Sequence, residues 1–133
     1  MADRGFESLD FYQDSLKLRK AAYRLANSLP DCERYILSDQ LRRAACSVLL
    51  KIAEGYGRYH YLDRLRFLYI ARGSLTETKS AFIIAESLGY CNTEQLNWVS
   101  QLKDRIEKGL NGYCRFIRSQ QQGKEEYGTR SIR

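Results

Sequence analysis

The sequence is poor in the residues that catalysis most often uses. Its 133 residues include one histidine, one tryptophan and one proline. No H-E-x-x-H or G-x-S-x-G motif is present, and no carboxylates are spaced for two-metal chemistry. The stretch GYG at residues 55–57 lacks the third glycine of a dinucleotide fingerprint and follows a helical pattern rather than a strand. We therefore expect a protein that is not an enzyme and has no cofactor or metal ion.

Cysteines are few and far apart, and long hydrophobic runs are missing. The four cysteines, at positions 32, 46, 91 and 114, do not form a C-x-x-C motif, and the first residues, MADRGFESLD, do not resemble a signal peptide. The most apolar stretch, AACSVLLKIA, contains Lys51 and is shorter than the roughly 18 uncharged residues of a membrane helix. We expect a soluble, cytoplasmic protein with reduced thiols.

Long helices are the natural interpretation of the first half of the chain, where Pro30 is the only proline. A helix is predicted over residues 10–29, with Gln13 placed as in a capping box. Its expected buried face comprises Tyr12, Leu16, Tyr23 and Ala26. A second helix is predicted over residues 37–57, where the two glycines of GYG suit a C-terminal cap. Its expected buried face comprises Leu37, Leu41, Ala44, Val48 and Ile52.

Two further helices are predicted in the second half. One covers residues 62–88 and is closed by Gly89, and the next opens at 92–93 with Asn92 and Gln95 at capping-box spacing. The apolar positions of the fourth helix are Val99, Leu102, Ile106, Leu110, Tyr113 and Ile117. The polar segment 119–133 is predicted to be a disordered tail. The fold class is therefore all-α: an up-and-down antiparallel four-helix bundle over residues 1–118.

The two middle helices carry apolar residues on more sides than one bundle core needs. A helix that is apolar on two sides must bury both. The bundle could enclose such a helix completely, but four helices in a square leave each one an outer side, which favours self-association. The predicted oligomer interface comprises Cys46, Leu50, Ala53, Phe67, Ile70, Ala71, Ser74, Ala81 and Ala85.

Basic charge is concentrated in two parts of the chain. The net charge is +6, of which residues 41–72 contribute +5 and residues 115–133 contribute +3. Such a surface favours a polyanion such as nucleic acid, although a basic face can also serve solubility alone. The joint between the second and third helices alternates cations, which neutralise phosphates, with aromatic rings, which stack on bases or seal the bundle end. Candidate nucleic-acid-binding residues are Lys51, Tyr56, Arg58, Tyr59, His60, Arg64 and Arg66.

Several motifs resemble a known family in order and spacing. They are FESLDFYQDSLKL, LPDCERYILSDQLRRAACSV, KIAEGYGR, RFLYIARGSLTET and AESLGY. Residues 6–118 are similar to the four-helix bundle proteins of intervening sequences in bacterial 23S rRNA genes. That family is similar in fold to the accessory variability determinant of diversity-generating retroelements, a basic pentamer that binds a reverse transcriptase and nucleic acid. The resemblance implies a homopentameric ring without enzymatic activity. Lys51 departs from the asparagine usual before IAEG, and the proline common near Leu49 is missing.

Three functions remain open at this point. The main expectation is a non-enzymatic, homo-oligomeric bundle that binds RNA or DNA with little sequence specificity. The first alternative is an adaptor that docks a protein partner such as a reverse transcriptase. The second is an enzyme of unrecognised type, for which the sequence offers only Glu54, His60, Glu77 and scattered tyrosines.

Overall fold

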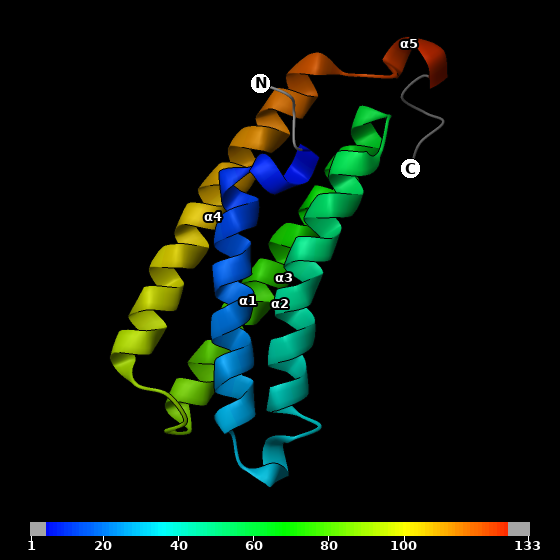
Figure 1. Cartoon of the computed structure of the whole chain (residues 1–133). Helices are drawn as coiled ribbons and strands as arrows, with labels where there is room; N and C mark the ends of the chain where they lie inside the picture. Colours follow the sequence, from blue (N-terminus) through cyan, green and yellow to red (C-terminus); the bar gives the residue numbers. More distant parts are fainter. Residues whose placement is uncertain (1–4, 128–133) are drawn as a thin grey trace.

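Four long helices make up most of the protein. The computed structural model describes residues 5–127, and every regular element in this range is helical. The long helices run up and down side by side (Figure 1); they are α1 (Asp10–Ser28), α2 (Leu37–Gly57), α3 (Tyr61–Ser87) and α4 (Thr93–Gln120). α2 packs against α1 and α3, and α4 packs against α3 and α1. The predicted all-α, up-and-down four-helix bundle is therefore confirmed.

Apolar side chains from all four helices fill the centre of the bundle. Among the largest with almost no exposed surface are Leu18, Val48, Ile52, Leu68, Leu75, Ile106 and Leu110. Full burial of such a side chain contributes about 1.5–3 kcal/mol, so packing rather than helix propensity holds the bundle together. Within the described range, no helix is long and apolar enough to cross a membrane.

The start of α1 differs from the prediction. The residue before the helix is Leu9, which makes no side-chain cap, and Gln13 Nε2 instead donates to the carbonyl of Glu7 at 2.9 Å. The predicted capping box is wrong because the 3-10 turn η1 (Gly5–Ser8) precedes the helix and uses the glutamine. The buried face is also rotated, since of its four predicted members only Ala26 is buried. Ser15 lies on the actual buried face and can be buried because its hydroxyl donates to the Phe11 carbonyl at 2.6 Å.

Glycine has a different role at the end of α2 than predicted. Neither Gly55 nor Gly57 has a positive φ, and the helix ends with Arg58 in an extended conformation. Gly55 is buried, and a Cβ there would lie 3.1 Å from both the Arg64 carbonyl oxygen and Leu68 Cγ. The predicted cap is therefore wrong, and Gly55 allows α2 and α3 to approach closely.

The end of α3 and the start of α4 agree with the prediction. Gly89 follows α3 with a φ of +79°, which is the left-handed conformation of a glycine cap. Asn92 and Gln95 form the predicted capping box: the Asn92 side chain accepts from the Gln95 amide, and the Gln95 side chain accepts from the Asn92 amide, both at 2.8 Å. Both boundaries are set by local chemistry that the sequence displays directly.

Helical structure continues beyond residue 118. α4 continues to Gln120, and α5 (Lys124–Tyr127) follows after a turn. The Tyr61 amide donates to the Gln122 carbonyl at 2.9 Å, so the turn between α4 and α5 contacts the start of α3 (Figure 1). For residues 119–127 the structure thus differs from the predicted disordered tail; the rest of that prediction, residues 128–133, lies outside the described residues.

All four cysteines are free thiols, as predicted. Cys32 lies in the short 3-10 turn η2 (Asp31–Glu33) and is exposed, whereas Cys46 is half-buried and within hydrogen-bonding distance of the Tyr23 hydroxyl, at 3.1 Å. Cys91 and Cys114 are buried, and burial raises the pKa of both thiols. Only Cys32 presents its sulfur on the open surface.

Candidate nucleic-acid interface

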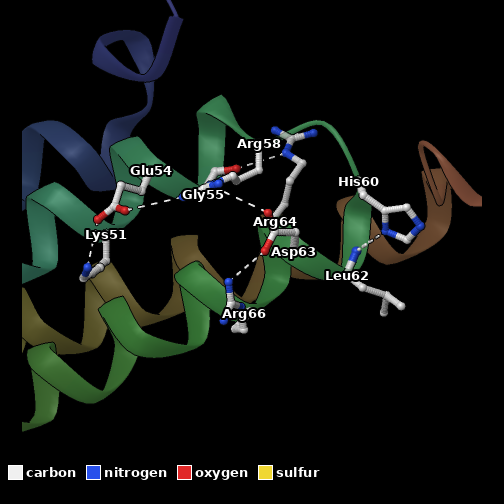
Figure 2. Close-up of polar contacts among 9 residues, drawn as sticks. All are labelled: Lys51, Glu54, Gly55, Arg58, His60, Leu62, Asp63, Arg64 and Arg66. Carbon is white, nitrogen blue, oxygen red and sulfur yellow. Dashed lines mark hydrogen bonds and ion pairs between the residues drawn. The ribbon is translucent and has the colours of Figure 1, made fainter. Parts of the chain in front are cut away.

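Three of the cations at the joint between α2 and α3 are already paired with carboxylates. Glu54 contacts Lys51 at 2.8 Å and Arg58 at 3.9 Å, and Asp63 contacts Arg58 at 3.6 Å and Arg66 at 3.0 Å (Figure 2). Three cations therefore share two carboxylates. Exposed pairs of this kind contribute about 0–1 kcal/mol each to stability, but they offset the local positive charge. This part of the joint is less basic than the sequence suggests.

The same three cations cover one aromatic ring. The Arg58 and Arg66 guanidinium groups lie 4.5 and 4.9 Å from the centre of the Phe67 ring, and Lys51 Nζ lies 5.6 Å from it. Phe67 is buried in the single chain. These cation–π contacts cover most of Phe67, which leaves little of its surface for the predicted oligomer interface.

Arg64 connects three helices. Its Nε donates to the Gly55 carbonyl at 3.2 Å and its Nη2 donates to the Tyr113 hydroxyl at 2.7 Å, so it joins the end of α2 to α4 (Figure 2 shows the first contact). Its guanidinium also lies 5.7 Å from the ring centres of both Tyr56 and Tyr113. Arg64 was predicted to bind nucleic acid, but these contacts assign it to the structure of the bundle end.

The aromatic residues of the joint mostly seal the bundle. Tyr56 packs edge-on against Phe6, with ring centres 6.3 Å apart. His60 is buried and caps α3, because its Nδ1 accepts from the Leu62 amide at 3.2 Å. Tyr59 is exposed and lies close to Gly123, where a Cβ would be 3.1 Å from its ring. Of the predicted aromatic residues, only Tyr59 presents a large surface to solvent.

A second basic cluster lies on α3 and α4, and sequence reasoning missed it as a unit. It comprises Tyr69, Arg72, Arg115 and Arg118 and is called the arginine face below. The Arg118 guanidinium donates to the Tyr69 hydroxyl, and the Arg72 guanidinium lies 4.9 Å from the Tyr69 ring centre. Arg72 also donates to Asn111 Oδ1 at 2.8 Å. Within the part of the chain that the structure describes, no carboxylate lies within ion-pair distance of these three arginines.

The three arginines act on one buried group. Burial raises the pKa of the Cys114 thiol, and the positive charges of Arg118, Arg72 and Arg115 each lower it. Arg115 lies on the same side of α4 as the rest of this cluster, because it is about one turn from both Arg118 and Asn111, which Arg72 contacts. A hollow of about 410 Å³ adjoins the arginine face; its lining includes Tyr61, Leu65, Arg66, Tyr69, Arg118 and Gln121.

The sequence contained a partial signal for this cluster. Tyr69 and Arg72 are three residues apart, as are Arg115 and Arg118, so each pair lies on one side of its helix. Nothing in the sequence states that the two pairs face each other, because that depends on how α3 packs on α4. The charges of Arg115 and Arg118 were instead assigned to the basic C-terminal region.

The predicted oligomer-interface residues fall into two groups. Within the single chain, Ala71, Ala81, Ala85 and Ser74 are buried, so they offer little surface to another copy. Ser74 also donates to the Ser47 hydroxyl at 2.8 Å. Others lie on the outer side of α2 and α3, where Leu50 is 62% and Ile70 is 44% exposed. Cys46 and Ala53 are half-buried.

Comparison with known proteins agrees with the fold. Residues 7–112 match the family model of the 23S rRNA-intervening sequence protein. The crystal structure of a protein of unknown function from the S23 ribosomal protein family of Bacteroides thetaiotaomicron is similar, with a TM-score of 0.71 and 21% identity; the match covers 78% of this chain and 97% of that one. No curated protein matches this chain. Because the family model spans most of its length, the chain belongs to the 23S rRNA-intervening sequence protein family.

Proposed function

We propose that this protein is a non-catalytic, self-associating bundle that binds RNA or DNA with little sequence specificity. The observation that carries the proposal is the arginine face, where three guanidinium groups gather without a carboxylate partner in the described range. A guanidinium donates two parallel hydrogen bonds to a phosphate and remains charged at any physiological pH. The phosphates of a nucleic acid supply the missing negative charge.

Low sequence specificity follows from the kind of contact that the arginine face offers. Contacts to phosphate and sugar fix the position of a nucleic acid but do not read its sequence. Tyr69 is 39% exposed beside the arginines and offers a ring on which any base can stack. Neither Arg72 nor Arg118 is held by an ion pair, so both can turn to a phosphate at the expense of hydrogen bonds to neutral groups and, for Arg72, of its contact with the Tyr69 ring.

Self-association is supported by the apolar side chains on the outer side of α2 and α3. Leu50 and Ser74 line a hollow of about 530 Å³ between the two helices, and Ile70, four residues before Ser74 on α3, is 44% exposed. Ile84, 47% exposed, lies on the same side of α3 as Ile70 because the two are 14 residues, about four turns, apart. A ring of five copies, as the family resemblance implies, would repeat the arginine face and give avidity for a long polyanion.

The assembly is tested by mass in solution. Light scattering on the purified protein should give several times 15.5 kDa, with five copies expected. Replacement of Leu50 by glutamate should lower that mass without unfolding the chain, because Leu50 is largely exposed in the single subunit. A monomer at all micromolar concentrations would contradict self-association.

The binding function is tested by fluorescence anisotropy with labelled single- and double-stranded RNA and DNA of unrelated sequence. We expect similar affinities for the different sequences and a steep fall of log affinity with log salt. The variant R72Q/R115Q/R118Q should lose about one unit of that slope for each phosphate contact removed. The control R34Q/R43Q/R105Q has the same net charge and should keep most of the slope.

Two outcomes would overturn the proposal. If the triple variant and its control changed equally, general charge rather than the arginine face would explain binding. If the wild-type protein bound neither RNA nor DNA, the adaptor function, in which the bundle docks a protein partner, would replace nucleic-acid binding.

A further inference from the structure

A further hollow, larger than those described above, lies at the opposite end of the bundle from the joint. It has a volume of about 750 Å³ and is formed by the second half of α1, the first half of α4 and the loop that precedes α4. Figure 1 shows these segments together at the end where α1 finishes and α4 begins. Sites for small ligands typically have volumes of about 300–1,000 Å³, so this hollow has the size of a binding site.

The floor of this hollow is apolar and its rim carries a large aromatic side chain. Leu25, Phe82 and Val99 line it and are all buried in the core. Trp98, the only tryptophan in the sequence, also lines it and is 49% exposed. A half-exposed indole beside an apolar hollow offers a flat surface on which another aromatic ring can stack.

The wall that α1 contributes is basic. Lys20 and Arg24 are four residues apart on the same side of α1 and both line the hollow. In the described range neither makes an ion pair, whereas Lys17, one turn earlier, contacts Asp14 at 3.6 Å. Glu94 is the one carboxylate among the lining residues. The hollow therefore combines an aromatic surface with two cations available for an anion.

We infer that this hollow binds a nucleotide, with the base stacked on Trp98 and the phosphate held by Lys20 and Arg24. A nucleotide joins a flat aromatic base to an anionic phosphate, and both parts have a complement here. The ligand is either a free mononucleotide or one nucleotide of a single strand, which share this chemistry. The site uses no residue of the arginine face, so this inference does not depend on the proposed function.

The single tryptophan gives the site a direct signal. Fluorescence of Trp98 is recorded while adenosine monophosphate, a short single-stranded oligoadenylate or ribose 5-phosphate is added to the full-length protein. Stacking predicts that the two probes that contain a base quench the fluorescence and that ribose 5-phosphate does not. Saturable quenching by the mononucleotide identifies a free nucleotide as a sufficient ligand, and quenching by the oligonucleotide alone identifies the nucleotide of a strand.

Variants separate this site from general charge. K20Q/R24Q should weaken the binding of the quenching probe at least about tenfold, because two charge-assisted hydrogen bonds are lost. R34Q/R43Q has the same net charge as K20Q/R24Q and should bind like the wild type. Thermal melting followed by circular dichroism checks that each variant is folded, and W98A, assayed by calorimetry, should also bind more weakly.

The inference is overturned by any of three results. One is the absence of quenching by both probes that contain a base, and another is equal quenching by ribose 5-phosphate. The third is a loss of binding in R34Q/R43Q as large as in K20Q/R24Q. Since Trp98 fluorescence reports the hollow and the salt slope of R72Q/R115Q/R118Q reports the arginine face, failure of one site leaves the other measurable.

Discussion

The joint and the arginine face are two basic regions with similar residues and opposite surroundings. Both place arginines beside aromatic rings, but at the joint Glu54 and Asp63 lie among the cations, whereas the described structure places no carboxylate within ion-pair distance of Arg72, Arg115 and Arg118. Charge density along the sequence is higher at the joint. The comparison shows that the availability of a cation depends on what the fold packs beside it, not on how many cations are adjacent in sequence.

The two regions also differ in what their arginines hold together. Arg64 bonds a backbone carbonyl of α2 and a hydroxyl of α4, so the joint depends on it. Arg72 and Arg118 bond only side chains of α3 and α4. We therefore expect the substitution of Arg64 to change stability and substitutions on the arginine face to change binding.

The largest effect on stability is expected from Arg64→Ala. It removes two charge-assisted hydrogen bonds and should lower the free energy of unfolding by about 2 kcal/mol, measured by urea denaturation. Tyr113→Phe removes one of the two and should lower it by about 1 kcal/mol. The salt slope of nucleic-acid binding should not change. A stable R64A protein with a reduced slope would assign Arg64 to the nucleic-acid contact.

The position of α4, which carries two residues of the arginine face, is tested by Gly109→Ala. A Cβ at this position would lie 2.9 Å from Phe11 Cβ, so α1 and α4 would have to separate. The cost of overpacking exceeds the gain in helix propensity, and we expect a net loss of about 1–2 kcal/mol in denaturation experiments. Gly73→Ala is the control: nothing lies within 4 Å of a Cβ there, and it should stabilise by up to about 1 kcal/mol.

Asp63→Asn should make the joint more like the arginine face. It removes the carboxylate that Arg58 and Arg66 share, so Arg66 loses its ion pair and Arg58 keeps only the 3.9 Å contact with Glu54; affinity for RNA and DNA should rise with a steeper salt slope. Asp63 lies in the first turn of α3, so its charge loss should cost about 0.3–1 kcal/mol of stability. Asp39→Asn, which frees only Arg43, is the matched control; an equal gain there would show that net charge alone sets affinity.

The smallest effect is expected from R58Q/R66Q. Exposed ion pairs contribute little, so the free energy of unfolding should change by less than about 1 kcal/mol. Nucleic-acid binding should weaken less than in R72Q/R115Q/R118Q, as measured by the same anisotropy titration. A larger loss of affinity than in the arginine-face variant would indicate that nucleic acid binds at the joint instead.

The sequence predicted the fold well where local chemistry sets it. Helix ends at Gly89 and at the Asn92–Gln95 capping box were predicted correctly because a positive φ and reciprocal hydrogen bonds require particular residues. The buried face of α1 was not predicted correctly, because Ser15 is polar yet buried. The predicted cap at Gly55 was also wrong, because this glycine serves a contact between two helices. Both errors come from tertiary packing, which periodicity does not contain.

The candidate site was predictable only in part. The sequence identified Arg58 and Arg66 as surface cations but did not show that Asp63, adjacent to both in space, pairs with them. The arginine face joins residues 69 and 118, which are far apart in the chain. Its recognition required the register of α3 against α4, which no local pattern encodes.

The uneven exposure of the four thiols has a practical consequence for labelling. Thiolate is the reactive form of cysteine, so burial and a raised pKa protect Cys91 and Cys114 from maleimide reagents, and Cys46 is partly covered next to Tyr23. Cys32 alone is exposed, in the turn between α1 and α2 at the end of the bundle far from the joint. One dye per chain can therefore be attached to the wild-type sequence, and energy transfer between labelled copies would test whether the chains associate.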